Sequence, residues 1–397
     1  MTSVSALRRS LTGVAVGAAS IGLLVSGCTS SNGSTGSPTA GEKAAVTVSI
    51  TLTPSGCAPS PATIEAGLVT FEITNRGADA VTEAELAKGN NVIGEKENLT
   101  PGLSGKFSVR LQPGSYVVNC PNAKTDHFDF TVAANATGAG SSAGADGSAA
   151  TSPANAAAVA AATTAYHDYV DAEVRQLVAA TATFTAAVKS GDIAAAKAAY
   201  GPARTHYESI EPVAESFGDL DPAIDARADD VADQSQWTGF HRLEKALWED
   251  NSLTGTAPIA DQLTADVAKL QALVVNQIYQ PATIANGCVE LLDEVARTKV
   301  TGAEDRYSHT DLFDFEANVS GAREGFTDIE PLLKRSDPAL AATIESRFAD
   351  VTEALEQYKQ GNGWVDYSTV GQDARRVLAQ KVDALAEPLS QVAALVG

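Results

Sequence analysis

A stretch of small and polar residues interrupts the chain near its middle and separates two regions with different hydrophobic patterns. It runs GAGSSAGADGSAATS over residues 138–152. Such low-complexity Gly-, Ser- and Ala-rich sequence is typical of a flexible linker. The chain of 397 residues is long enough to hold one domain on each side of it. We therefore expect a small domain at 46–132, a linker at 133–154 and a large domain at 155–397.

The small domain has the pattern of short β-strands. AVTVSITL alternates in β-branched residues, and GLVTFEITNRG has the form of a strand that ends in a turn. GKFSVRLQPGSYVVNC contains two strand-like runs joined by a Gln-Pro-Gly turn signal, and HFDFTV closes the region. Short strands at regular spacing over roughly 90 residues favour an all-β Greek-key sandwich.

The large domain is rich in alanine and has helical spacing of its apolar residues. After AYHDYVDAEVRQLVAATATFTAAVKS, Gly191 and Asp192 end one helix and cap the next. No strand pattern interrupts the remainder, so the sequence predicts an all-α helical bundle. Further helices are expected near 222–249, 259–280, 285–299, 311–334, 337–360 and 371–395.

The N-terminus has the features of an export signal. Arg8 and Arg9 precede an apolar run over residues 11–25, which is short for a membrane span. The run ends in Val-Ser-Gly-Cys, a pattern that predicts cleavage after residue 27 and lipidation of Cys28. Residues 28–45 would then be a flexible tether, and the protein would be extracytoplasmic and lipid-anchored. The alternative is a plain secretory signal.

The overall charge restricts the kinds of partner. The net charge is −21 and the pI is about 4.6. Nucleic-acid binding needs a basic face, so this class is excluded. A strongly acidic surface instead attracts cations.

The segment GFHRLEKALW places His241 three residues before Glu244 in a predicted helix. Positions i and i+3 share a helix face, so an imidazole and a carboxylate can point at one ion. This ligand pair suits iron, manganese or zinc. A zinc protease needs His-Glu-x-x-His, but Arg242 follows the histidine and Lys245 stands at i+4. Peptidase activity is therefore not expected.

Two acidic segments accompany this pair. Buried carboxylates repel one another unless they are protonated, paired with a cationic side chain or bound to a cation. The alternative is a solvated acidic face paired with Arg204, Arg242 and Arg306. The segments HYESIEPVAE and EDRYSHTDLFDF contain Glu208, Glu211, Glu215, Glu304, Asp305, Asp311 and Asp314.

The helical region resembles the imelysin-like domain of the EfeO family of iron-uptake lipoproteins. The segments that carry the resemblance are TGFHRLEKALW, THYESIEPVAESFGDLD, IDAR and EDRYSHTDLFDFEANVSG. The resemblance implies a metal site at His241 and Glu244, with Asp261, Glu211 and Glu304 as further candidate ligands. It implies ferrous or ferric iron as the cation, and a membrane iron permease and a haem peroxidase as partners.

The small domain resembles the cupredoxin-like domain of the same family in TPSGCAPSPATIEAG, EKENLTPG and SYVVNCPNAKTDHF. The resemblance implies a copper or iron site formed by Cys57, Cys120 and Glu83, with Glu85 as the alternative to Glu83. A type 1 copper centre needs two histidines and usually a methionine, but this region has only His127 and no methionine. The alternative is a disulfide between the two cysteines, because exported chains form such bonds.

Together these patterns predict a non-enzymatic iron-binding lipoprotein that delivers iron to a permease. Two alternatives remain open from the sequence. One is a metal-dependent enzyme, either a metallopeptidase or a protein whose small domain oxidises ferrous iron. The other is a structural surface module in which the His-x-x-Glu pair is only a helix salt bridge.

Overall fold

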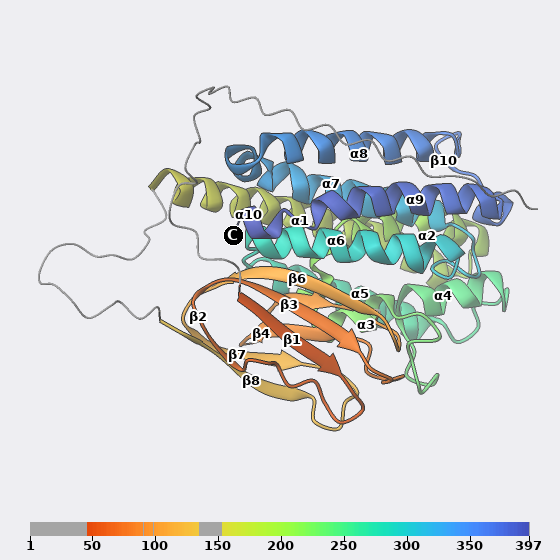
Figure 1. Cartoon of the computed structure of the whole chain (residues 1–397). Helices are drawn as coiled ribbons and strands as arrows, with labels where there is room; N and C mark the ends of the chain where they lie inside the picture. Colours follow the sequence, from red (N-terminus) through yellow and green to blue (C-terminus); the bar gives the residue numbers. More distant parts are fainter. Residues whose placement is uncertain (1–45, 90, 98, 135–152, 397) are drawn as a thin grey trace, which may run out of the picture. The chain divides into compact units, whose positions relative to one another are not determined.

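The computed structural model describes residues 46–89, 91–97, 99–134 and 153–396. The expected signal peptide at 1–27, the Cys28 tether at 28–45 and most of the linker at 133–154 lie outside the described residues. Within the described part, no helix has both the length and the apolar character needed to cross a bilayer. The chain folds as a β-rich region followed by a large helical region, which confirms the predicted fold class (Figure 1).

Eight strands of the β-rich region form two sheets. One sheet has the order β1-β3-β6, and the other has the order β2-β8-β7-β4-β5. Phe71 of β3 stacks on Phe107 of β6 and meets Phe130 of β8 edge-on, so side chains from both sheets share one core. The strands are β1 (Val46–Leu52), β2 (Thr63–Glu65), β3 (Gly67–Asn75), β4 (Ala84–Lys88), β5 (Asn91–Lys96), β6 (Ser104–Leu111), β7 (Gly114–Asn119) and β8 (His127–Ala133).

The helical region is built around the long helix α1, which packs against α2, α5 and α7. Its buried apolar residues form one continuous core. The helices are α1 (Pro153–Ser190), α2 (Ile193–Glu208), α3 (Leu220–Asp225), α4 (Gly239–Trp248), α5 (Ala257–Val274), α6 (Pro281–Arg297), α7 (Asp311–Ser336), α8 (Pro338–Glu356), α9 (Gln372–Leu389) and α10 (Ala393–Val396), with short 3-10 helices η1 (Glu211–Phe217), η2 (Lys299–Thr301) and η3 (Tyr367–Thr369).

The structure divides the helix expected at 222–249. Helix α3 ends at Asp225 and α4 begins at Gly239, with an irregular segment between them. Gly239 has a φ of 85°, and a Cβ there would lie 2.3 Å from the carbonyl oxygen of Ile224. Only glycine permits this close approach of the two helices. The start of α4, and with it the direction of His241, is therefore fixed by a backbone contact that hydrophobic spacing does not reveal.

The prediction that no strand interrupts the helical region is wrong at one place. Helix α8 ends at Glu356, and a short hairpin follows, formed by β9 (Lys359–Gln360) and β10 (Gly363–Trp364). Gly361 has a φ of 61°, in the left-handed region that favours glycine. Two glycines within five residues thus produce a tight turn instead of a longer helix.

The β-rich and helical regions belong to one compact unit from Lys43 to Gly397, and β5 and β6 contact α6. Lys96 of β5 inserts its ammonium group between two carboxylates of α6, 2.6 Å from Glu290 and 3.0 Å from Asp293. Asn286 of α6 donates a hydrogen bond to the carbonyl of Ser108. Because Lys96 is buried, loss of these carboxylates would leave its charge without a partner, so the pairing of Lys96 depends on the docking of β5 against α6.

Candidate metal centre

His241 lies in the first turn of α4 and is 1% exposed. Its Nδ1 is 3.2 Å from Glu244 Oε2 on the same helix and 3.3 Å from the Tyr200 hydroxyl on α2. Its Nε2 faces Glu304 Oε1 at 3.4 Å and Asp225 Oδ1 at 3.7 Å, yet it has no hydrogen-bond partner. The two carboxylates lie within ion-pair distance of this nitrogen but at the long end of hydrogen-bond geometry, so the nitrogen remains available as a ligand for a cation.

The backbone of the following loop orients Glu244. Glu244 Oε1 accepts hydrogen bonds from the amides of Tyr307 at 2.9 Å and Ser308 at 2.7 Å. The second oxygen, Oε2, is thereby turned towards His241. The i, i+3 spacing brings the two groups together as the sequence predicts, and the loop fixes which carboxylate oxygen is presented.

Two possible metal-ligand groups share His241. One consists of His241, Asp225 and Glu304, and the other of His241, Glu244 and Asp305, with candidate ligand atoms within 4.8 Å of one another in each group. We call these five residues the His241 site. One imidazole and several carboxylates form a ligand set suited to iron, manganese or zinc.

Buried cationic side chains hold the surrounding carboxylates. Arg204 of α2 is fully buried and contacts Glu208 and Asp225 directly, Asp314 at 3.1 Å and Glu304 at 3.2 Å. Arg204 was an expected pairing partner, but the acidic segments are largely buried here, which excludes the solvated face for them. Arg204, Arg227 and Lys299 pair with a larger set of carboxylates, which includes Glu208, Glu211, Asp225, Glu304, Asp305 and Asp314.

The surplus of carboxylates favours the protonated form of His241. Burial and the nearby Arg204 guanidinium lower the pKa of His241, but Glu244, Glu304 and Asp225 outweigh them and raise it to about 10. Burial raises the pKa of Asp225 to about 7, against the lowering effect of Arg204 and His241. A bound metal ion needs the neutral imidazole. The site is therefore one in which a metal cation would take the place of a proton.

The predicted ligands of the helical region occupy three different places. Glu304, in the loop before α7, belongs to the His241 site. Glu211 pairs with Lys299 at 2.7 Å, next to Glu208. Asp261 of α5 is exposed and pairs with Lys189 at 3.0 Å, outside every possible ligand group among the described residues. Asp225, which the sequence reasoning did not name as a candidate ligand, lies in the IDAR segment, but its approach to His241 depends on the Gly239 contact.

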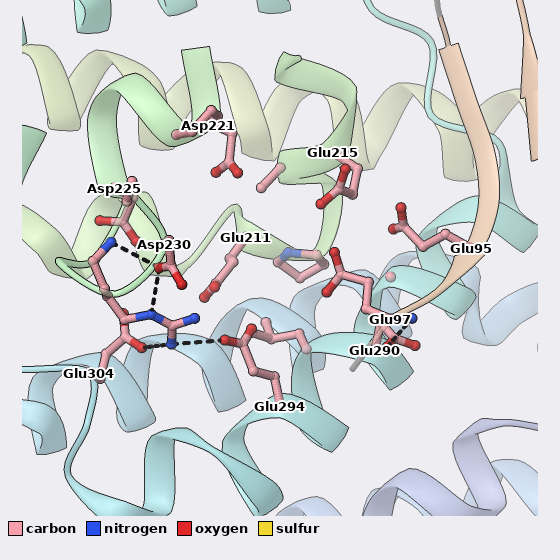
Figure 2. Close-up of a pocket in the computed structure, with 17 residues that line it drawn as sticks. Glu95, Glu97, Glu211, Glu215, Asp221, Asp225, Asp230, Glu290, Glu294 and Glu304 are labelled. Atoms are coloured by element: carbon pink, nitrogen blue, oxygen red, sulfur yellow. Dashed lines mark hydrogen bonds and ion pairs between the residues drawn. The ribbon is translucent and has the colours of Figure 1, made fainter. Parts of the chain in front are cut away.

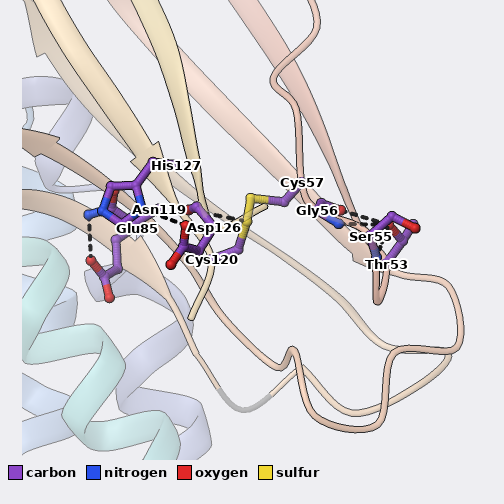
Figure 3. The surroundings of a disulfide bond; sticks show 9 residues. All are labelled: Thr53, Ser55, Gly56, Cys57, Glu85, Asn119, Cys120, Asp126 and His127. Carbon is purple, nitrogen blue, oxygen red and sulfur yellow. Dashed lines mark hydrogen bonds and ion pairs between the residues drawn. A yellow bond between two sulfur atoms is a disulfide. The ribbon is translucent and has the colours of Figure 1, made fainter. Parts of the chain in front are cut away.

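The structure replaces the predicted thiolate site of the β-rich region with a disulfide. Cys57 and Cys120 are bonded to each other and are fully buried (Figure 3). Their sulfurs are therefore not thiolate ligands, and the expected copper or iron site formed by them with Glu83 is corrected. Burial raises the pKa of Glu83 to about 7, and the charges of Glu85 and Glu290 contribute because they lie near its carboxylate at the contact between the β-rich and helical regions.

An acid-lined cavity of about 240 Å³ adjoins the His241 site. Figure 2 shows ten labelled carboxylates around it, with Asp225 and Glu304 at one end and Glu95 and Glu97 at the other. Arg227 is the one basic side chain among the described residues that line it. The acidic lining of the cavity thus reaches from Asp225 and Glu304 of the His241 site to Glu95 of strand β5.

Comparison with known proteins places this arrangement in a family. The Imelysin family model (Peptidase_M75) matches residues 162–392. An "Iron uptake system component EfeO" of Escherichia coli O1:K1 / APEC is 41% identical over 353 residues, covering 88% of this chain and 91% of that protein. Proteins with the same name from E. coli strain K12 and Shigella flexneri are each 40% identical over the same shares. The chain therefore belongs to the imelysin family and, within it, to the EfeO iron uptake system components.

Proposed function

We propose that this chain is a non-enzymatic, extracytoplasmic iron-binding protein that captures iron at the His241 site. The observation that carries the proposal is the buried Nε2 of His241, which has no hydrogen-bond partner and faces Asp225 and Glu304. The relatives are named as iron uptake system components, which supports iron as the ion. Imidazole and carboxylate ligands accommodate iron in either oxidation state.

The proposed binding step exchanges cations. At neutral pH His241 carries a proton, because the surrounding carboxylates raise its pKa to about 10. An entering iron ion would displace the proton on Nε2 and accept electron pairs from that nitrogen and from the carboxylates of Asp225 and Glu304, while Glu244 would orient the ring through Nδ1. The backbone amides that hold Glu244 Oε1 would keep that carboxylate in position during the exchange.

Delivery to a membrane is the second part of the proposal. The N-terminal pattern that ends at Cys28 supports a lipid anchor, which would keep the iron-loaded protein close to a membrane iron permease. A haem peroxidase of the same uptake system is the proposed further partner. The acidic surface would help to concentrate iron from a dilute solution.

The proposal is tested by metal titration of the purified mature chain. His241→Ala combined with Glu244→Gln should lower the affinity of one iron ion by more than about 100-fold, because even groups that only orient a ligand contribute up to about that factor. The matched control is His127→Ala with Glu72→Gln, which removes the same two side-chain types from exposed positions. Unchanged iron stoichiometry and affinity in the His241 and Glu244 variant would overturn the assignment.

A further inference from the structure

Three basic side chains contact the carboxylates around His241, and Arg227 differs from the other two in its exposure. Arg204 and Lys299 lie in the core, with 0% and 1% of their side chains exposed. The side chain of Arg227, in the irregular segment between α3 and α4, is 27% exposed. It is also the one member of the three that lines the acid-lined cavity. Arg227 is therefore the cation that can change its position without unpacking the core.

Arg227 and His241 share the carboxylate of Glu304. The Nη1 of Arg227 donates a hydrogen bond to Glu304 Oε2 at 2.9 Å. The other oxygen, Oε1, faces His241 Nε2 at 3.4 Å. The negative charge of a carboxylate is spread over both oxygens, so a guanidinium bound to Oε2 makes Oε1 a weaker electron donor. Arg227 thus competes for a carboxylate that the proposed function assigns to iron.

Arg227 has two further partners that do not belong to the His241 site. Its Nη1 is 3.2 Å from Glu294 Oε1 of α6, and its Nε is 3.1 Å from Asp230 Oδ2. The same Asp230 oxygen accepts a hydrogen bond from the backbone amide of Arg227 at 3.0 Å. Asp230, Glu294 and Glu304 all line the cavity (Figure 2). Because a guanidinium has five N–H donors, Arg227 can leave Glu304 and remain paired with the other two acids.

Arg204 and Lys299 have no comparable alternative. Their ion partners all lie around the His241 site and are largely buried, namely Glu208, Glu211, Asp225, Glu304, Asp305 and Asp314. Moving either cation away would leave buried carboxylates unpaired, which is strongly destabilising. Asp230, in contrast, is 46% exposed, so Arg227 can be held there in contact with water. Arg204 and Lys299 therefore support the fold of the site, whereas Arg227 is free to exchange.

We propose that Arg227 is a competing cation, built into the protein, that sets how tightly the His241 site holds iron. In the unloaded protein its guanidinium pairs with Glu304 and lowers the affinity of the site. When iron binds at Glu304, the guanidinium shifts towards Glu294 and Asp230. It returns when the ion leaves, which assists the release that delivery requires. The inference rests on the proposed function and adds the residue that regulates the same site.

The test measures the iron affinity of the full mature chain by equilibrium dialysis and elemental analysis. Iron is supplied as Fe²⁺ without oxygen and, separately, as a ferric complex with a weak chelator. Arg227→Gln removes the charge, and Arg227→Lys keeps it. The matched control is Arg306→Gln, because Arg306 is 31% exposed, pairs with Asp229 of the same irregular segment at 2.6 Å and is not among the residues that line the cavity. Circular dichroism and thermal unfolding establish that each variant is folded.

We expect Arg227→Gln to bind iron at least about tenfold more tightly than the wild-type protein. One charge beside a carboxylate changes the proton affinity of that carboxylate by about 10- to 1,000-fold, and the lower end is expected for a partly exposed arginine. Arg227→Lys and Arg306→Gln should stay close to the wild-type affinity. Combining Arg227→Gln with His241→Ala/Glu244→Gln should abolish the gain.

Crystal structures supply a second measurement. In crystals soaked with iron, Arg227 should contact Glu294 or Asp230 and no longer Glu304, whereas metal-free crystals should keep the contact with Glu304. An Arg227 side chain that remains on Glu304 beside a bound ion would contradict the exchange.

The binding data can overturn the inference in two ways. Equal affinity in Arg227→Gln and the wild-type protein would show that the guanidinium does not compete. Weaker binding in Arg227→Gln would show that it orients Glu304 for the ion instead. Both results leave the proposed function standing. A wild-type protein that binds neither form of iron, or a gain that persists without His241 and Glu244, would contradict the proposed function and this inference with it.

Discussion

The sequence suggests a metal site in both the helical and the β-rich region, and the structure shows different arrangements at the two places. In the helical region, His241, Glu244 and Glu304 meet in one buried site. In the β-rich region, Cys57 and Cys120 are joined in a disulfide. The two places differ in whether the candidate ligand atoms are free to bind a metal: His241 Nε2 makes no hydrogen bond, whereas both sulfurs are already bonded to each other.

The difference also lies in what holds each group in place. Arg204 and Lys299 bind the carboxylates around His241 from within the core. These cations reduce the repulsion between carboxylates, although they leave an excess of negative charge. The cysteine pair needs no such support, because a covalent bond closes a 63-residue separation in the chain. Residue types that commonly bind metals can thus form either a candidate binding site, as around His241, or a structural disulfide, as at Cys57 and Cys120.

The largest expected effect comes from removing the buried cation. Arg204→Met should lower the free energy of unfolding of the helical region by about 3–5 kcal/mol, because it leaves several carboxylates buried without their partner. Unfolding in urea, followed by tryptophan fluorescence, measures the loss. Trp248 is a suitable reporter because its ring lies 5.4 Å from that of Tyr200, on the helix that carries Arg204.

The control for this substitution is Arg347→Met, which removes the same side chain from an exposed ion pair with Asp350. An exposed pair contributes about 0–1 kcal/mol, so its loss should be small. If Arg204→Met and Arg347→Met cost the same, the carboxylates around His241 do not depend on the buried guanidinium. Saturating Mn²⁺ should recover part of the stability in the Arg204 variant, because a metal cation can replace the lost charge.

The second test concerns the disulfide. Cys57→Ser with Cys120→Ser should destabilise the β-rich region by about 2–4 kcal/mol, since the unfolded chain is no longer cross-linked. Differential scanning calorimetry of both proteins measures this change. Iron binding at His241 should remain as in the wild-type protein. Loss of a bound ion together with the cysteines would restore the thiolate interpretation of the β-rich region.

The third test concerns the proton on His241. Because its pKa is raised to about 10, His241 is protonated at pH 7 and releases this proton when a metal binds. Below that pKa, the affinity for Mn²⁺ should rise by about tenfold per pH unit from this group alone. Calorimetric titration in buffers of different ionisation enthalpy counts the released protons. His241→Ala should release one proton fewer per ion; equal proton release in both proteins would contradict the assignment.

The sequence predicted those features that depend on local spacing. The change from strand to helix patterns and the shared helix face of His241 and Glu244 follow from periods of 2 and 3.6 residues. Asp225 was not predicted, because its position depends on the close approach of α3 and α4 at Gly239. Lys299 was missed for a similar reason, since its partners Glu208 and Glu211 are distant in sequence.

The approach of Glu95 and Glu97 to Glu215 shows the same limit across domains. EKENLTPG is part of the resemblance to the EfeO family, and Glu215 is part of a carboxylate stripe, but nothing local connects the two segments. Their approach depends on β5 docking on α6, where Lys96 pairs with Glu290 and Asp293. Such long-range contacts are determined by the packing of whole elements, and spacing within one segment carries no information about them.

The smallest expected effect is at Asp261, which the resemblance suggested as a ligand. The structure places its carboxylate on the exposed face of α5, in an ion pair with Lys189. Asp261→Asn should therefore leave iron affinity and stoichiometry unchanged and alter stability by no more than about 0.5 kcal/mol. Glu304→Gln is the matched comparison, because it removes a carboxylate 3.4 Å from His241 Nε2. Reduced iron affinity in Asp261→Asn, with no reduction in Glu304→Gln, would move the site from the buried cluster to the surface of α5.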